Sequence, residues 1–478
     1  MSAMKTGTVV ESVIKNGLSL LVVRGTLLVS SAVVTVFLIR YLGAEGFGSY
    51  SAASNIYAVF LPIIFFGFGS VIARDAAKDP GAAWKYFINI LYAGFFLTVI
   101  CTAGMGLFCA AVKYPPVVTK AALILAIGLY PNFIVYIAES LFIGLEKVKY
   151  FAAINFLYSV IEVVLMLAVL FLGYKIFAIV AILVFTRYVF AAMAVVLITR
   201  VVQVDHFNID TKFISRLVKV SVVFSATGIL AGVLFKIDVL FLSKMVGVYE
   251  TGIYAAALKL INLCSLGITS FVGVFYPIAS KYYVDRQPGE YRDICLMATK
   301  CTVLMVFFAI VSTLCLSREA ILFLFGTEYE KSIHVLNMLI FLLIPICGTA
   351  LFGIFLASCN RQKYDLVAIT LATLISPALN YYLVKYFSYY GSIYANLGAF
   401  SFLQLLQAYF VNKYVFKLEY IETIMKPVAV LAVTVLFIHA AGALVWYARF
   451  IIALLVFVAL SAAFRVISRK DIELFLTA

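Results

Sequence analysis

The chain has 478 residues, of which 65% are hydrophobic and only 12% are charged. A soluble protein of this length cannot bury so much apolar surface, so lipid must be the solvent for much of the chain. The net charge of +14 is spread over short loops between apolar runs. Positive charges in such loops orient a membrane protein in the bilayer. We therefore do not expect a nucleic-acid partner.

The apolar runs are continuous and long enough for helices that cross a bilayer, which need about 20 residues. Strands of a membrane barrel would instead alternate apolar and polar residues in segments of about 10. We therefore predict an all-α integral membrane protein with about 14 transmembrane helices. The first is expected to be a retained helix and not a cleaved signal peptide. The predicted segments are 17–39, 48–73, 86–112, 119–143, 153–173, 176–199, 217–240, 253–280, 294–316, 332–358, 367–387, 392–412, 427–447 and 450–467.

Most of the 36 Lys and Arg residues lie in alternate loops and at the two ends of the chain. By the positive-inside rule, this predicts a multi-pass protein of the cell membrane with both termini in the cytoplasm. The loops are too short for a nucleotide-binding domain, and the phosphate-binding Gly-x-x-x-x-Gly-Lys-Ser/Thr pattern is absent from the sequence. The eight cysteines form no Cys-x-x-Cys, and the three histidines are far apart. We expect neither an enzyme nor a bound metal or cofactor.

A degenerate repeat gives the first view of domain organisation. The stretch 40–50 between the first two segments returns 204 residues later, at 244–254. The matched pairs are Arg40 and Lys244, Gly43 and Gly247, Gly48 and Gly252, and Tyr50 and Tyr254. We predict two pseudo-symmetric six-helix bundles, at 1–200 and 217–412, joined by a basic linker at 200–216. An additional two-helix appendage follows at 427–467.

Two charges within the predicted segments fall at matching depths. Glu162 lies ~14 Å from the cytoplasmic start of its helix and Arg187 ~13 Å from the cytoplasmic end of the next, at 1.5 Å per residue. Because a short turn joins the two helices, we expect these charges to pair or to share a hydrated cavity near the midplane. A purely structural ion pair is the alternative. Glu162 is also the candidate for coupling transport to a proton gradient.

Other ionisable residues also lie within the predicted segments. Arg24 lies ~10 Å inside the first helix, too deep to reach the interface easily, and is predicted to bind an anion. Lys259 lies in the eighth segment. Lys236 and Asp238 are two residues apart near the outer end of their segment, where a continuous helix would point them in different directions. Glu139 is expected near the interface.

Several short motifs carry a family resemblance. They are Arg40–Tyr50, Gly67–Ser70 before Ala73-Arg74-Asp75, Gly144–Lys147, and Lys236-x-Asp238 followed by Gly247 and Gly252-Ile253-Tyr254. Together they resemble the polysaccharide biosynthesis flippases of the multidrug/oligosaccharidyl-lipid/polysaccharide (MOP) exporter superfamily. The resemblance covers at least residues 10–290.

The resemblance implies two bundles around a central cavity with alternating access. It also implies a substrate in which an oligosaccharide is carried on a polyprenyl (pyro)phosphate. The flippase would move it from the cytoplasmic to the outer leaflet for cell-surface polysaccharide biosynthesis. The candidate cations for its phosphates are Arg24, Arg187, Lys236 and Lys259, and the coupling or ion-pair candidates are Glu162, Asp238 and Glu139.

Two other functions stay open at this point. One is a cation-coupled multidrug antiporter of the same superfamily, and the other is a non-transporting scaffold for glycan assembly. We expect a monomer surrounded by membrane lipids, with glycan polymerases or glycosyltransferases as candidate partners. The sugar and the energy source are left undecided.

Overall fold

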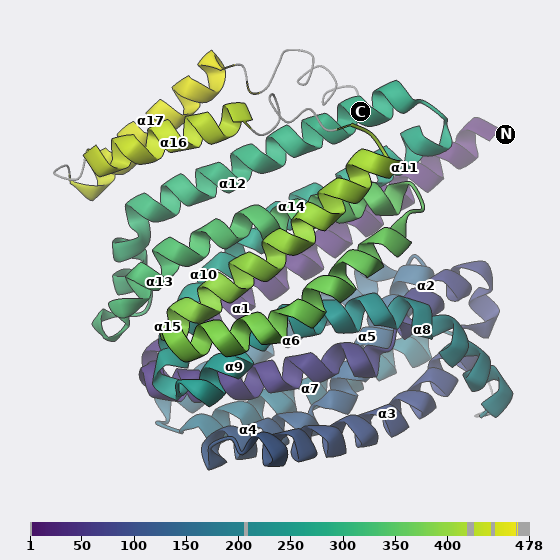
Figure 1. Cartoon of the computed structure of the whole chain (residues 1–478). Coiled ribbons are helices and arrows are strands. Elements are labelled where there is room, and N and C mark those ends of the chain that lie inside the picture. Colours follow the sequence, from purple (N-terminus) through teal and green to yellow (C-terminus); the bar gives the residue numbers. More distant parts are fainter. Residues whose placement is uncertain (1, 205–208, 418–424, 441–444, 465, 467–478) are drawn as a thin grey trace. The chain divides into compact units, whose positions relative to one another are not determined.

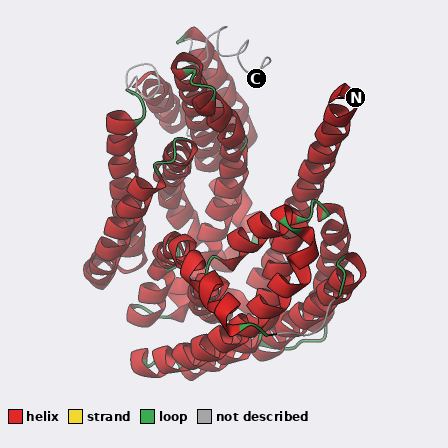
Figure 2. Ribbon diagram, turned by 90° about the vertical axis from the view of Figure 1, so that its right-hand side faces the viewer, coloured by secondary structure: helices red, strands yellow, loops and turns green. Residues whose placement is uncertain are grey.

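In the computed structural model, residues 2–204, 209–417, 425–440, 445–464 and 466 are described, apart from certain side chains, chiefly those before Ser30. Throughout these residues the secondary structure is helical, and no strand occurs among them (Figure 2). The all-α prediction is therefore confirmed. The described residues pack as two compact units, Met1–Gly252 and Ile253–Ala478.

Unit 1 contains nine complete helices and the start of a tenth. They are α1 (Ser2–Phe65), α2 (Phe68–Lys78), α3 (Ala83–Val112), α4 (Pro116–Ile127), α5 (Leu129–Gly144), α6 (Val148–Phe171), α7 (Ile176–Val201), α8 (Thr211–Leu234), α9 (Ile237–Met245) and the beginning of α10 (Val248–Gly273). A large apolar core joins α1 to α5 and includes Ile56, Phe68, Phe87 and Phe133.

Unit 2 contains the rest of α10 and the helices that follow. They are α11 (Phe275–Val284), α12 (Pro288–Leu324), α13 (Lys331–Leu339), α14 (Leu343–Ser358), α15 (Gln362–Tyr414), α16 (Lys426–Ala440) and α17 (Trp446–Ala463). The last two helices pack against each other and against α12, as Figure 1 shows in yellow and teal. The predicted division at 1–200, 217–412 and 427–467 rests on the repeat and stays a prediction.

Each of the fourteen predicted segments falls on helix in the described part of the chain. Ten helical stretches there are long and apolar enough to cross a membrane, and the bent pair α4–α5 makes an eleventh. Two of the ten, Ser30–Lys78 and Gln362–Tyr414, each contain two predicted segments. Breaks at Gly43 and Ser388 interrupt the helices there. The apolar part of α16, Lys426–Ile438, is shorter.

Helix α3 illustrates why lipid must surround the molecule. Its large apolar side chains Phe95, Phe96, Val99, Ile100 and Leu107 are all exposed on the protein surface. In water such a stripe would be strongly unfavourable, whereas in hydrocarbon it costs nothing to leave it uncovered. The exposed stripe thus supports the assignment as an integral membrane protein.

The repeated motif forms a close contact between two helix segments of unit 1. Gly43 adopts φ 65° and ψ 178°, a conformation open essentially to glycine alone. Its repeat partner Gly247 also has a positive φ, of 135°. Each glycine lies just before a helical segment, and these two segments then approach each other at Gly48 and Gly252.

The approach is reciprocal between the two copies of the motif. A Cβ on Gly48 would overlap the backbone carbonyl of Val248, and a Cβ on Gly252 would overlap the carbonyl of Ala44. Ala44 and Val248 are themselves equivalent under the 204-residue offset. The contact therefore has the pattern of a local two-fold axis, in which residue i of one copy meets residue j of the other and the reverse.

We predict that Gly48→Ala and Gly252→Ala each destabilise the protein by more than the roughly 1–3 kcal/mol typical of overpacking. The added methyl group meets backbone, which cannot move aside as a side chain would. The measurement is the thermal unfolding temperature of the detergent-purified protein.

The matched control is Gly106→Ala on α3, where the new Cβ would make an ordinary 3.7 Å contact with Leu123. Alanine also favours a helix over glycine, so this variant should keep or slightly raise the unfolding temperature. An unfolding temperature unchanged in Gly48→Ala and Gly252→Ala would contradict the proposed backbone contact.

Candidate functional site

The interior faces of α6 and α7 carry the two charges that the sequence placed at one depth. Glu162 lies on the same face of α6 as the buried Tyr158 and Met166. Arg187 lies on the same face of α7 as the buried Val184 and Phe190. Both charged residues are only half-buried. Each charge therefore shares a helix face with buried residues of unit 1.

An aromatic stack holds the arginine in place. The Cζ atom of Arg187 lies 5.3 Å from the centre of the Tyr158 ring, within the range of a cation–π interaction. Tyr158 stacks in turn on Phe190, with ring centres 4.3 Å apart and planes inclined by 8°. The ring of Phe151 lies 5.7 Å from that of Phe190. The groups in this stack come alternately from α6 and α7. The stack therefore holds the two helices side by side and also positions the guanidinium group.

Glu162 and Arg187 interact electrostatically, but among the described residues they do not form an ion pair within 4 Å. Each also acts on the ring hydroxyl of Tyr158. The two charges are therefore near enough to interact, while the predicted ion pair or shared hydrated cavity stays a prediction. Their predicted roles in substrate binding and ion coupling stay predictions.

Helix α1 contributes two tyrosines to the same electrostatic environment. Both Tyr50 and Tyr57 interact with the charge of Arg187. The hydroxyl of Tyr57 donates to the carbonyl of Gly128 at 3.2 Å and accepts from the Asn132 amide at 3.0 Å. The second half of α1 is therefore tied to the junction of α4 and α5. The site draws its polar groups from α1, α5, α6 and α7, which pack against one another.

The buried hydroxyl of Ser159 lacks a hydrogen-bond partner among the described residues, whereas that of Tyr158 lies close to the side chains of Glu162 and Thr186. Buried polar groups are normally paired, so an unpaired one marks a place where water or a ligand completes the bonding. A half-accessible cation, aromatic faces and hydroxyl groups together can hold an anion or a sugar. No group of three or more metal-ligating side chains occurs in the described part of the chain.

The structure shows a break in the helix that carries Lys236 and Asp238. The segment 217–240 was expected to be one continuous helix, but α8 ends at Leu234 and α9 begins at Ile237. Lys236 lies in the turn between them, so helical spacing does not separate its charge from Asp238, and the two interact electrostatically. Asp238 is only 1% exposed.

The remaining candidates lie apart from this cluster or outside the described side chains. Lys259 is half-buried on α10 within unit 2, where it interacts with neighbouring groups. Glu139 is half-buried on α5, in electrostatic contact with Tyr136. Arg24 lies on α1, but its side chain is outside the described part of the structure.

Sequence reasoning missed the uncharged members of the cluster. Tyr158 stands four residues before Glu162 and Phe190 three residues after Arg187, so each shares a helix face with its charge. That spacing was a usable signal. Tyr50 belongs to the repeated motif, which was a second signal. Nothing in the sequence pointed to Tyr57 or Asn132, because their pairing depends on how α1 meets α5.

Several solved membrane transporters have a similar fold. The lipid II flippase MurJ, in an inward closed conformation, matches with a TM-score of 0.71 at 14% identity, covering 95% of this chain and 99% of that one. A multidrug resistance MATE family transporter, facing inward, matches with a TM-score of 0.66 at 15% identity, covering 80% and 93%. A MOP superfamily transporter from Pyrococcus furiosus gives 0.59 at 16% identity, covering 83% and 94%.

These likenesses show that the chain shares its fold with these transporters. No curated protein matches the chain by sequence. A family described as polysaccharide biosynthesis protein matches residues 13–283, which is more than half of the chain. The chain therefore belongs to the polysaccharide biosynthesis protein family.

Proposed function

We propose that this protein is a flippase for oligosaccharides linked to a polyprenyl (pyro)phosphate. It would move them from the cytoplasmic to the outer leaflet of the cell membrane by alternating access, without chemical conversion. The observation that carries the proposal is Arg187, a cation held on an aromatic stack inside unit 1 with part of its surface accessible. Such a cation suits a phosphate group that has to leave water.

The surroundings of Arg187 fit the rest of such a substrate. Tyrosine rings and hydroxyls, as at Tyr50, Tyr57 and Tyr158, offer apolar faces and hydrogen-bonding groups to a sugar. Family membership supports a role in polysaccharide biosynthesis. The fold shared with the lipid II flippase MurJ supports movement of a lipid-linked molecule.

A second function has its own supporting observation. Glu162 is a half-buried carboxylate in the same cluster as Arg187, and a solved MATE multidrug transporter has a similar fold. A cation-coupled multidrug antiporter would use such a carboxylate to exchange a proton for an organic cation. The positive charge of Arg187 disfavours an organic cation at this place, so the flippase is the first choice.

We predict that Arg187→Ala reduces flipping of a labelled polyprenyl-diphosphate oligosaccharide by about tenfold or more in proteoliposomes. Hydrogen bonds to charged groups contribute roughly 1.5–3 kcal/mol, and 1.4 kcal/mol corresponds to about a factor of ten. The readout is the fraction of glycan that becomes accessible on the opposite face of the membrane.

Arg200→Ala is the matched control, because Arg200 is an exposed arginine at the end of the same helix. It should flip at the wild-type rate. Two results together would overturn the flippase proposal in favour of the antiporter. The wild-type protein would move no lipid-linked glycan, and a proton gradient would drive it to export an organic cation.

If Glu162 couples transport to protons, an imposed proton gradient should accelerate transport by the wild-type protein. Glu162→Gln should remove this response, because an amide cannot exchange a proton, while preserving the shape of the side chain. Transport is followed in the same proteoliposomes with and without the gradient.

Glu146→Gln, in the exposed connection before α6, serves as the control and should respond as the wild type does. Wild-type transport that stays constant after both proton and sodium gradients are collapsed would exclude coupling through Glu162.

A further inference from the structure

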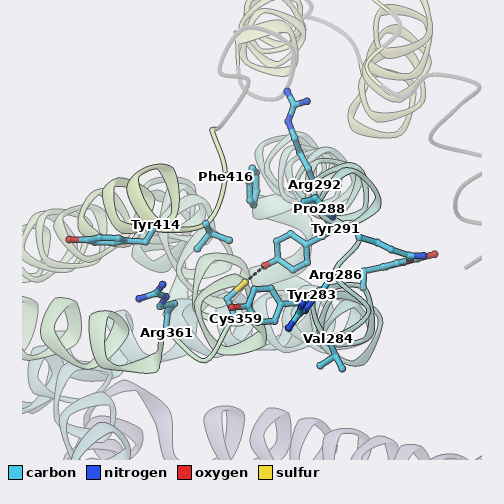
Figure 3. Close-up of a pocket in the computed structure, with 13 residues that line it drawn as sticks. Tyr283, Val284, Arg286, Pro288, Tyr291, Arg292, Cys359, Arg361, Tyr414 and Phe416 are labelled. Carbon is cyan, nitrogen blue, oxygen red and sulfur yellow. Dashed lines mark hydrogen bonds between the residues drawn. The ribbon is translucent and has the colours of Figure 1, made fainter.

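Unit 2 contains a cavity of about 740 Å³ that the charged cluster of unit 1 does not use. Three chain segments form it: the connection between α11 and α12, the connection between α14 and α15, and the end of α15 (Figure 3). The sequence assigned all three segments to the basic, cytoplasmic side of the membrane. Its volume is in the range of small-molecule sites in proteins, roughly 300–1,000 Å³.

The charge of the cavity is of one sign. The described residues that line it include Arg286, Arg292 and Arg361 but no carboxylate. Figure 3 shows Arg292 pointing away from Tyr291, whereas Arg286 and Arg361 lie on opposite sides of the Tyr291–Cys359 pair. Guanidinium groups match the geometry of phosphate oxygens, and two of them from separate loops can approach one anion from two sides.

The part of the cavity lining that these two arginines flank, Tyr291 and Cys359, is firmly built. Tyr291 is only 4% exposed, and its hydroxyl is 3.2 Å from the Phe355 carbonyl and 3.0 Å from the Ser358 hydroxyl. The thiol of Cys359 donates to the same hydroxyl at 3.1 Å. These bonds fix α12 to the end of α14. The cavity is therefore held open by a buried polar network and does not depend on loops alone.

The rim of the cavity is apolar and exposed. Val284 is 73% exposed, and Tyr283 and Tyr414 also present much of their surface. Next to Tyr414, the amine of Lys413 bonds to the Tyr409 hydroxyl at 3.2 Å. Cations at a cavity with an apolar rim form the pattern expected where headgroups and hydrocarbon meet.

We infer that this cavity binds the phosphate headgroup of an anionic phospholipid, with Arg286 and Arg361 on the phosphate and the acyl chains over Val284 and Tyr283. Two features favour a lipid over a free phosphate ion. The volume exceeds what one small ion needs, and the exposed apolar rim has no use for a soluble anion. The inference concerns unit 2 alone and does not depend on the proposed flippase activity.

The test measures binding of a fluorescent short-chain phosphatidylglycerol to the full-length detergent-purified protein by fluorescence anisotropy. We expect Arg286→Gln combined with Arg361→Gln to weaken binding by about tenfold or more, because charge-assisted hydrogen bonds to the phosphate are lost. Unlabelled phosphatidylglycerol should displace the probe, whereas phosphatidylcholine of equal chain length should do so poorly.

Arg318→Gln is the matched control, since Arg318 is an exposed arginine of unit 2 that pairs only loosely with Glu330, at 3.8 Å. It should bind the probe as the wild type does. Val284→Asp is a second variant that leaves the core intact, because Val284 is exposed. Its carboxylate would place a charge under the acyl chains and should weaken binding even if the double variant folds poorly.

Either of two results would overturn the inference. Unchanged probe binding in both the double variant and Val284→Asp would place the lipid elsewhere. Displacement of the probe by inorganic phosphate or pyrophosphate at concentrations as low as those of the unlabelled lipid would show that the site takes a soluble phosphate compound.

Discussion

The backbone contact at Gly48 and Gly252 is the constraint on which unit 1 depends. The two helix segments meet without side chains between them, so their separation is set by the backbone itself. Tyr50 follows Gly48 by two residues, and Tyr57 lies two turns further along α1. The contact between Gly48 and Gly252 therefore helps to determine where these tyrosines lie relative to Arg187.

Inside the membrane, the energetic problem is to keep Arg187 and Glu162 charged at tolerable cost. The structure answers with several weak contributions and no close ion pair. Ring stacking on Tyr158, opposite charge nearby and partial access to the interior each stabilise the cation. A cation that is fully neutralised by its partner would bind an incoming phosphate poorly, whereas a loosely compensated one keeps that capacity.

The sequence predicted well what depends on composition and chain order. Residue spacing alone predicts the apolar segments and the repeat of Gly48 at Gly252. It also predicts that Glu162 and Arg187 lie near each other across a short turn. The sequence did not predict the two-residue break at Lys236. Such a break changes the directions in which the following side chains point. The sequence also could not find Asn132 or the arginine-lined cavity of unit 2, because those depend on contacts between distant segments.

The reciprocal glycine contact has a consequence for the ancestry of the chain. Since Ala44 meets Gly252 and Val248 meets Gly48, each copy of the motif carries both surfaces of the contact. A half-length chain with one such motif is then complementary to itself, and two identical chains can associate through it. Gene duplication and fusion would preserve this glycine contact, while the residues around it diverged between the two halves.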